Sequence, residues 1–385
     1  MKNSYDVIVL GAGFAGATIA NLLARENKKV LVVEKRAQIG GNMYDYYHSN
    51  GVLVHKYGPH IFHTNYKEVF DYLKEFGEFV PYEHKVLANI DGTLVPVPFN
   101  FTSLEKLYGD KAKPLEEKLT KKYPNQTRVS VLDLINDVNS DIKEFGNYVY
   151  EKIFAYYTAK QWGISVDKVD KSVINRVPVI LGYEDTYFSD SYQYMPKDGF
   201  TSLFKNMLNH PNIDILLNTS ASEVIKLING EIIFKDEPFK GKLVYTGALD
   251  ELFNYQYGPL PYRSLRLEFE DHDVTYYQSN SVINYTTSED FTRITEFKYL
   301  SGQNIKDKTT ILKEYSLAYT KDNYLKVCPY YPIINEDNLK LYQRYQDLLK
   351  DYPQISLCGR LAEYKYYNMD VVILKAFEVA KNLLE

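Results

Sequence analysis

Residues 5–16 read YDVIVLGAGFAG and decide the fold of this chain. The apolar run predicts a β-strand, and the three glycines after it predict a tight turn into a helix from Ala17 to Arg25. Gly11 permits the bend, Gly13 lets backbone amides approach a pyrophosphate, and Gly16 lets the helix pack closely on the strand. The helix amino terminus then faces the diphosphate. The stretch is typical of a dinucleotide-binding unit, although glycine-rich turns also close ordinary strand-to-helix junctions.

A second strand favours the dinucleotide interpretation. Residues 30–33 are all apolar and lead into Glu34, which lies 23 residues after Gly11. A carboxylate at that point can accept hydrogen bonds from both ribose hydroxyls and repels a 2′-phosphate, which favours FAD or NAD over NADP. The doublet Gly40-Gly41 then resembles the extended fingerprint of FAD-binding proteins of the glutathione reductase and amine oxidase type. FAD is therefore the expected cofactor.

Composition argues against several other classes of protein. The 385 residues exceed one typical domain, and their net charge of −5 comes without long runs of one sign, which argues against a nucleic-acid surface. The two cysteines, Cys328 and Cys358, form no Cys-x-x-Cys motif, so neither a disulfide framework nor a zinc or iron–sulfur site is predicted. So few cysteines are typical of a reducing compartment, and a cytoplasmic location is expected. His60 and His63 lie three residues apart without further ligands nearby in the sequence, so no metal is expected.

No membrane span is expected either. Residues 7–24 contain no charge and could be mistaken for a membrane helix. Three glycines interrupt them, however, Thr18 and Asn21 are polar, and the same residues satisfy the dinucleotide pattern.

The rest of the chain predicts a mixed α/β fold. Residues 57–64 predict a turn-rich loop, 66–76 a short helix and 86–99 strands at a sheet edge, while 103–160 predict amphipathic helices separated by Pro124 and Gly146. Further strands are predicted at 212–217, 231–234, 243–246, 262–269 and 281–284, and a helix at 338–350. We therefore expect a Rossmann-like FAD-binding domain with an inserted helical domain and an antiparallel β-sheet domain. The expected segments are 1–78, 201–255 and 326–385 for the FAD-binding domain, 79–100 and 256–325 for the sheet domain, 101–165 for the helical insert, and 166–200 for a lid and sheet segment.

The C-terminal block mirrors the start of the chain. Residues 355–360 predict a strand and a loop, and an apolar helix follows to Leu384. A strand that returns to the nucleotide sheet would aim Gly359, Arg360 and the helix amino terminus near Asn368 at the cofactor.

Six further motifs, taken together, point to one family. They are Tyr157-Thr158-Ala159-Lys160-Gln161-Trp162-Gly163, Arg176-Val177-Pro178, Tyr187-Phe188-Ser189-Asp190, Tyr262-Arg263-Ser264-Leu265, Phe291-Thr292-Arg293 and Gly359-Arg360-Leu361-Ala362-Glu363-Tyr364. In this order and spacing the chain resembles the UDP-galactopyranose mutase family over nearly its whole length.

The resemblance implies a flavin-dependent isomerase that interconverts UDP-galactopyranose and UDP-galactofuranose. N5 of the reduced flavin attacks the anomeric carbon, with no net redox change. The implied cofactor is FAD, active as FADH⁻. The implied partners are a UDP-sugar substrate, an external reductant such as NAD(P)H or a cellular flavin reductase, and a second copy of the chain in a homodimer. The product would serve synthesis of cell-surface polysaccharides that contain galactofuranose.

The resemblance also implies roles for individual residues. Arg176 and Arg293 would bind the diphosphate through their planar guanidinium groups, and His63 would hydrogen-bond the reduced ring or relay a proton. The loop that carries Arg176 resembles the mobile lid of the family. The other implied substrate residues are Tyr157, Thr158, Trp162, Tyr187, Tyr315, Tyr366 and Asn368, and the implied FAD contacts are Gly11, Gly13, Phe14, Gly16, Glu34, Lys35, Gly41, Asn42, His60, Ile61, Arg360 and Met369.

Two positions depart from the family pattern. Some members carry an aspartate where this chain has Asn368, with Asp370 two residues later, so a charge-dependent contact there is in doubt. Ile153 stands where some relatives present an aromatic ring to the base. The same chemistry on UDP-N-acetylgalactosamine or dTDP-fucopyranose is therefore an open alternative. An amine-oxidase-like flavin oxidoreductase and an FAD-binding protein without catalysis are alternatives of other classes.

Overall fold

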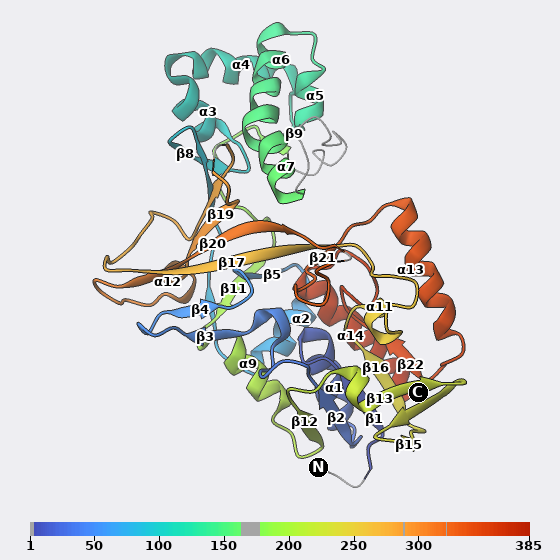
Figure 1. Cartoon of the computed structure of the whole chain (residues 1–385). Helices are drawn as coiled ribbons and strands as arrows, with labels where there is room; N and C mark the ends of the chain where they lie inside the picture. Colours follow the sequence, from blue (N-terminus) through green and yellow to red (C-terminus); the bar gives the residue numbers. More distant parts are fainter. Residues whose placement is uncertain (1–3, 163–177, 288, 321) are drawn as a thin grey trace.

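The nucleotide-binding sheet has five parallel strands in the order β12-β2-β1-β16-β22, seen at the bottom of Figure 1. The computed structural model describes residues 4–162, 178–287, 289–320 and 322–385. The strands are β1 (Val7–Leu10), β2 (Val30–Val33), β12 (Ile213–Leu216), β16 (Lys242–Tyr245) and β22 (Ile355–Leu357), so three separated parts of the chain build one sheet. β1 pairs with β2 on one side and with β16 on the other. Ligands bind open α/β sheets at such a reversal of strand order.

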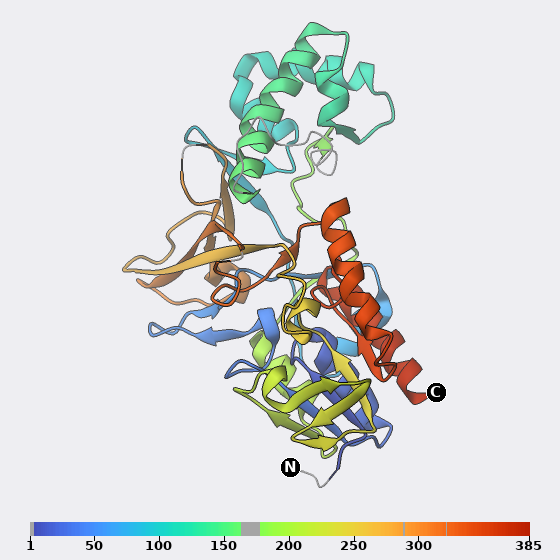
Figure 2. The same ribbon diagram turned by 45° about the vertical axis from the view of Figure 1, so that its right-hand side comes forward.

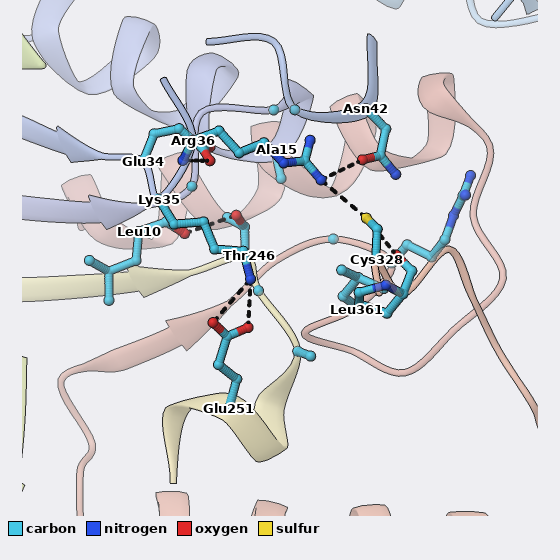
Figure 3. Close-up of a pocket in the computed structure, with 18 of the residues that line it drawn as sticks. Leu10, Ala15, Glu34, Lys35, Arg36, Asn42, Thr246, Glu251, Cys328 and Leu361 are labelled. Atoms are coloured by element: carbon cyan, nitrogen blue, oxygen red, sulfur yellow. Dashed lines mark hydrogen bonds and ion pairs between the residues drawn. The ribbon is translucent and has the colours of Figure 1, made fainter. Parts of the chain in front are cut away.

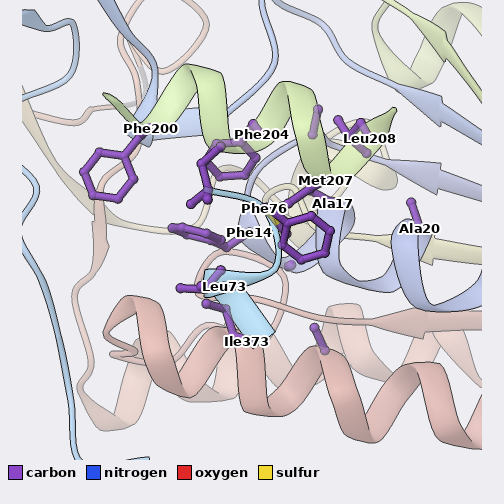
Figure 4. Packing of buried hydrophobic residues seen from close by; sticks show 14 of the residues in the cluster. Phe14, Ala17, Ala20, Leu73, Phe76, Phe200, Phe204, Met207, Leu208 and Ile373 are labelled. Atoms are coloured by element: carbon purple, nitrogen blue, oxygen red, sulfur yellow. The ribbon is translucent and has the colours of Figure 1, made fainter. Parts of the chain in front are cut away.

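Both faces of this sheet are covered, which explains why its strands are uninterrupted apolar runs. Val7 and Val9 belong to the core formed with α1 (Phe14–Arg25), α9 (Gly199–Leu208) and α14 (Met369–Leu384). Figure 4 shows this core, in which the Phe14 and Phe204 ring centroids lie 4.6 Å apart. On the other face, Ile8 and Leu10 pack with a small antiparallel sheet. The elements on that side are α10 (Ala221–Val224), β13 (Ile225–Ile228), β14 (Glu231–Phe234), β15 (Glu237–Pro238) and α11 (Leu249–Leu252).

A second sheet of seven strands crosses the middle of the molecule in the order β21-β17-β20-β19-β18-β7-β8 (Figure 1). Its strands are β7 (Val86–Ile90), β8 (Thr93–Val97), β17 (Tyr262–His272), β18 (Val282–Tyr285), β19 (Arg293–Glu296), β20 (Thr309–Ala318) and β21 (Tyr331–Pro332). The expectation of an antiparallel sheet needs one correction, because β18 pairs with β7 in parallel. The remaining pairs are antiparallel, and β17 and β20 form a ten-residue ladder from Arg263 and Ala318 to His272 and Thr309.

The helical unit stands above this sheet in both views (Figures 1 and 2). Its core includes Leu104, Leu119 and Phe145 and continues onto Val86 and Ala88 of β7. Its elements are α3 (Phe101–Tyr108), η2 (Gly109–Lys111), α4 (Ala112–Lys122), β9 (Arg128–Ser130), α5 (Val131–Ile135), α6 (Ser140–Val149), the π-helical η3 (Tyr150–Ala155), α7 (Tyr156–Trp162) and β10 (Pro178–Ile180).

The sequence prediction that Gly146 separates two helices is wrong, because Gly146 lies inside α6. A Cβ at Gly146 would lie 2.7 Å from the backbone nitrogen of Ile135, so the glycine lets α5 and α6 pack closely. The domain boundaries expected from the sequence stay predictions.

Smaller elements link these units. The strands β5 (Phe62–Thr64), β11 (Tyr192–Pro196) and β6 (Phe79–Pro81) form a three-stranded sheet. The others are η1 (Gly41–Met43), the hairpin β3 (Asp45–Tyr47) and β4 (Leu53–His55), α2 (Lys67–Lys74), α12 (Phe297–Ser301) and α13 (Glu336–Leu349).

The Rossmann-like mixed α/β fold predicted from the first forty residues is confirmed. The first helix begins at Phe14 rather than Ala17, because Gly13 serves as its N-cap. The sequence prediction did not include β11, α9, β19 or β20.

Candidate functional site

A cavity of about 550 Å³ opens where β1, β2, β16 and β22 end. Its lining includes Gly11, Glu34 and Thr246, which directly follow β1, β2 and β16, and Gly359, which lies two residues after β22. The carboxyl ends of parallel strands meet at one edge of a sheet, so a single cavity receives all of these loops. Figure 3 shows the labelled lining residues converging on it from separate segments of the chain.

The glycines form a cradle that side chains would fill. Gly11 has φ +113°, and a Cβ there would lie 2.0 Å from Oγ1 of Thr246. The backbones of Gly13 and Gly41 approach each other so closely that a Cβ on Gly41 would lie 2.9 Å from Cα of Gly13. Gly16 is outside the lining, and a Cβ there would lie 1.9 Å from the Gly11 carbonyl oxygen, so this glycine brings the helix against the strand. This cradle fits the backbone approach that a dinucleotide diphosphate requires.

Glu34 is buried at the end of β2, and its carboxylate organises the turn. Oε2 accepts a hydrogen bond from Ala12 N–H at 2.9 Å, and Oε1 accepts one from Arg36 N–H at 3.0 Å. Each carboxylate oxygen has a further lone pair, so the group can also accept hydrogen bonds from ribose hydroxyls.

Cationic side chains lie beside Glu34 in the cavity wall (Figure 3). Lys35 forms an ion pair with Glu251 at 2.9 Å. Arg36 donates to Oδ1 of Asn42 at 3.0 Å and contacts Sγ of Cys328 at 3.2 Å. Phe14 and Met369 also line the cavity, whereas Ile61 is outside the lining and packs in the core.

Arg360 connects this cavity with a second group of residues, which consists of Arg293, Tyr331 and Tyr366. Arg360 lines the cavity, and its guanidinium donates to the Tyr367 carbonyl oxygen at 2.6 Å. The same group lies over the Tyr331 ring, with Cζ 4.2 Å from the ring centroid. Tyr331 stacks on Tyr366 at 4.8 Å with an interplanar angle of 18°. A planar cation stacked over an aromatic ring is held in one orientation. Arg360 is therefore held in place between the cavity and the second group.

Arg293 lies in this second group with a buried carboxylate beneath it. Its Nε is 2.9 Å from Oε2 of Glu314, which is only 1% exposed. The Glu314 carboxylate, with Tyr157 and Tyr331 nearby, outweighs burial and raises the pKa of Arg293 above its usual value. The charges of Arg293 and Arg360 also act on His60, whose pKa is lowered to about 3 mainly by burial. At neutral pH the site therefore holds two cations beside an uncharged imidazole.

His63 lies on the small sheet and is oriented from two sides. Its Nδ1 is 2.9 Å from Oδ2 of Asp190, and its ring stacks on Phe188 with centroids 3.6 Å apart. His84 lies close by, and burial, helped by Arg293 and His63, lowers its pKa to about 3. The backbone N–H of Tyr187 donates to the His84 carbonyl oxygen at 2.8 Å, and the Tyr187 ring meets the His84 ring edge-on.

The helix α7 supplies the residues predicted to bind uridine. The Tyr157 hydroxyl donates to Oδ1 of Asn284 at 3.4 Å, and Thr158 is half-buried. Trp162 is the last residue of α7. Arg176 and the loop predicted as a lid lie outside the described residues.

The structure does not bring Tyr315 together with Arg293. On β20, Tyr315 directly follows Glu314, and successive strand residues point to opposite faces of the sheet. Because Glu314 contacts Arg293, the Tyr315 ring faces the other way, and Arg266 lies over it at 3.7 Å. Tyr331, which the sequence prediction did not include, takes a place beside Arg360 and Tyr366.

The structure shows the surroundings of the two positions, Asn368 and Ile153, that depart from the family pattern. Asn368 is the exposed N-cap of α14, and its side chain makes no capping hydrogen bond. Asp370 cannot stand in for a carboxylate there, because it is buried and accepts a hydrogen bond from the Thr64 hydroxyl at 2.9 Å. Ile153 is 4% exposed in the core of the helical unit, so it is not available to stack on a base.

Two kinds of feature are absent from the described residues. No helix among them is both long and apolar enough to cross a membrane. No three or more His, Cys, Asp or Glu side chains gather among them in a way that could hold a metal ion.

This chain is similar to known proteins over its whole length. A family model described as UDP-galactopyranose mutase matches residues 152–366, and a model for an NAD(P)-binding Rossmann-like domain matches residues 9–76. UDP-galactopyranose mutase from Mycoplasma pneumoniae (strain ATCC 29342 / M129 / Subtype 1) is 35% identical over 100% of this chain and 97% of the relative. dTDP-fucopyranose mutase from Escherichia coli is 36% identical over 97% of each chain. A crystal structure of reduced UDP-galactopyranose mutase covers 100% of this chain and 94% of its own with a TM-score of 0.70, and at 15% identity this likeness shows the fold alone.

Proposed function

Because this chain belongs to the UDP-galactopyranose mutase family, we propose that it is a flavin-dependent isomerase that interconverts UDP-galactopyranose and UDP-galactofuranose. One observation carries the proposal. Arg360 lines the dinucleotide cavity and at the same time lies over Tyr331, which adjoins Arg293 and Tyr366. A cofactor in the cavity and a nucleotide sugar beside Arg293 would therefore be neighbours.

The cavity fits FAD. Gly11, Gly13 and Gly41 would receive the diphosphate, and Glu34 would accept the ribose hydroxyls. Arg360 would place positive charge beside the anionic reduced cofactor. When bound and reduced, FAD supplies the nucleophile for the anomeric carbon of the sugar.

Arg293 would hold the leaving diphosphate. Glu314 contacts Nε, so the two terminal amino groups are the donors that can face phosphate oxygens. The pKa of Arg293 is raised, so the guanidinium keeps its charge at every working pH. Arg176 is assigned the same role by the family motif.

Histidines would control protons around the sugar. With Nδ1–H donated to Asp190, His63 keeps Nε2 as the nitrogen that can take or give a proton. His60 and His84 are neutral because burial lowers their pKa values to about 3, so they can donate or accept hydrogen bonds without adding charge. Tyr157, Thr158 and Trp162 would bind uridine, and Tyr187 and Tyr366 the diphosphate or the sugar.

We also propose a location, an oligomeric state and a reductant for the enzyme. We place the enzyme in the cytoplasm as a homodimer, with an external reductant such as NAD(P)H or a cellular flavin reductase, and its product in cell-surface polysaccharide synthesis. dTDP-fucopyranose is the second candidate substrate, because a relative named for that activity is 36% identical. In addition, this chain has Asn368 where some members of the family carry an aspartate.

The test is direct. Purified FAD-loaded protein is incubated anaerobically with UDP-galactofuranose or with dTDP-fucofuranose, with and without dithionite, and the pyranose form of each is followed by chromatography. Conversion only with reduced flavin supports the proposal. Conversion of dTDP-fucofuranose alone would move the assignment to the second candidate. Substrate-dependent flavin bleaching with peroxide formation would point to an oxidase instead.

A further inference from the structure

Lys160 lies at the junction between the helical unit and the seven-stranded sheet. It belongs to α7, three residues after Tyr157, so both side chains leave the same face of the helix. Its ammonium donates to the carbonyl oxygens of Tyr285 at 2.6 Å, Glu289 at 2.9 Å and Phe291 at 3.3 Å. One cation therefore holds both sides of the turn that joins β18 to β19.

This turn leads directly into Arg293. Phe291 accepts from Lys160, the next residue Thr292 donates its N–H to the Glu314 carbonyl oxygen at 2.7 Å, and Arg293 then meets the Glu314 side chain. Three consecutive residues, the last two before β19 and its first residue Arg293, are thus held by Lys160 and Glu314. The position of Arg293 along the sheet depends on both contacts.

The same contact fixes α7. The Tyr157 hydroxyl reaches Asn284, the residue before Tyr285, so the helix touches the hairpin at two adjacent points. Partial burial lowers the pKa of Lys160, while Glu289 and Asp290 oppose that shift. Charge-assisted hydrogen bonds to three carbonyl groups are the compensation that a partly buried ammonium requires.

We infer that Lys160 is a positioning residue that sets the distance between the predicted uridine residues of α7 and the predicted diphosphate residue Arg293. This inference rests on the proposed function, because a UDP-sugar would span these two groups. Lys160 acts through the hairpin and the helix and does not itself touch the nucleotide. Loss of the contact therefore weakens nucleotide binding more than it slows the chemical step.

The chain contains a matched control. Lys152 of η3 forms an ion pair with Asp91 at 2.9 Å, and Asp91 lies in the turn between β7 and β8 of the same sheet. This pair also joins the helical unit to the sheet, but Asp91 is 58% exposed, and exposed pairs contribute little. A general loosening of the two units would follow from either change, whereas loss of positioning follows only from a change at Lys160.

The experiment measures UDP binding to the FAD-loaded protein by calorimetry for wild type, Lys160→Met and Lys152→Met. We expect the Kd for UDP to rise about tenfold in Lys160→Met, with a similar rise in KM and less than a threefold fall in kcat, and to change less than twofold in Lys152→Met. Lys160→Arg keeps several donors and should recover most of the affinity, and Lys160→Gln should lie between Arg and Met.

Intrinsic fluorescence gives a readout that does not depend on the substrate. The chain has a single tryptophan, Trp162, two residues after Lys160 in the same helix. Its emission without nucleotide should shift in Lys160→Met and stay unchanged in Lys152→Met. If Lys160→Met fails to fold or to retain FAD, the Arg and Gln variants decide the question by their order of affinity.

The outcomes separate the two proposals. Equal UDP affinity across the Lys160 series, or equal effects of Lys160→Met and Lys152→Met, overturns the positioning role. A wild-type holoenzyme that binds no UDP overturns the proposed function, and the fluorescence comparison still decides whether Lys160 holds α7 in place.

Discussion

Glu314 and Arg293 form an ion pair across two neighbouring strands, with Oε2 of Glu314 2.9 Å from Nε of Arg293. The carboxylate is almost fully buried, while the side chain of Arg293 is 32% exposed. The pair therefore has a buried half that fixes geometry and an accessible half that can meet a ligand.

Glu314→Gln should lower kcat/KM at least about tenfold. Glutamine keeps the size of the side chain but removes the negative charge 2.9 Å from Nε of Arg293, and a tenfold loss corresponds to about 1.4 kcal/mol. Steady-state kinetics on UDP-galactofuranose with reduced enzyme measures the effect. Glu270→Gln is the control, because it removes a partly exposed pair with Lys313 on the adjoining strands and should change kcat/KM less than twofold. Equal effects of the two changes would contradict a specific role for Glu314.

Gly41→Ala should abolish most FAD binding. The added Cβ would lie 2.9 Å from Cα of Gly13, so one of the two backbones that form the cradle must move. The ratio of flavin to protein absorbance after purification measures the loss.

Gly92→Ala is the matched control for that change. Gly92 also has a positive φ, and a Cβ there would have no atom within 4 Å. Both variants carry a similar backbone cost of about 1–2 kcal/mol, but only Gly41→Ala should lose flavin. Full FAD content in Gly41→Ala would show that the cradle does not hold the cofactor.

The dinucleotide unit could be predicted from the sequence because its parts are contiguous. The strand, the glycine turn, the helix and Glu34 lie within residues 5–34, and each has a local reason for its type. The Arg293 site has no such local signal. Glu314 is 21 residues away on another strand, and Tyr331 comes from a two-residue strand at the sheet edge.

The sequence alone does not show on which face of β20 Tyr315 lies. One step along β20 separates it from Glu314, and that step exchanges the two faces of the sheet. Only the pairing of β19 with β20 shows which of the two residues faces Arg293.

Stability should fall in mild acid because of His55. Burial lowers the pKa of its imidazole from 6.5 to about 4, and its Nδ1 accepts a hydrogen bond from His60 N–H at 3.0 Å. Between these two pH values the unfolded chain binds a proton that the folded chain excludes. Acid therefore favours unfolding, and His55 alone contributes about 1.4 kcal/mol for each pH unit in this window, to which His60 and His84 add.

Urea unfolding at pH 7, 6 and 5 measures this dependence. His55→Asn keeps an acceptor near the Nδ1 position and removes the titrating group, so its free energy of unfolding should depend less steeply on pH. The same slope in both proteins would contradict the assignment to His55.

Tyr331→Ala should weaken UDP binding, whereas Tyr315→Ala should leave it almost unchanged. Tyr331 stacks on Tyr366 and lies under the Arg360 guanidinium, so Tyr331→Ala removes a contact between the cofactor cavity and the predicted diphosphate site. We expect about a tenfold rise in the Kd for UDP, since aromatic stacking and cation–π contacts contribute about 0.5–2 kcal/mol each. Tyr315→Ala should leave that Kd within about twofold, because its ring faces Arg266 on the other side of the sheet. Calorimetry on the two variants decides between them, and a larger effect of Tyr315→Ala would return this tyrosine to the substrate site despite its placement.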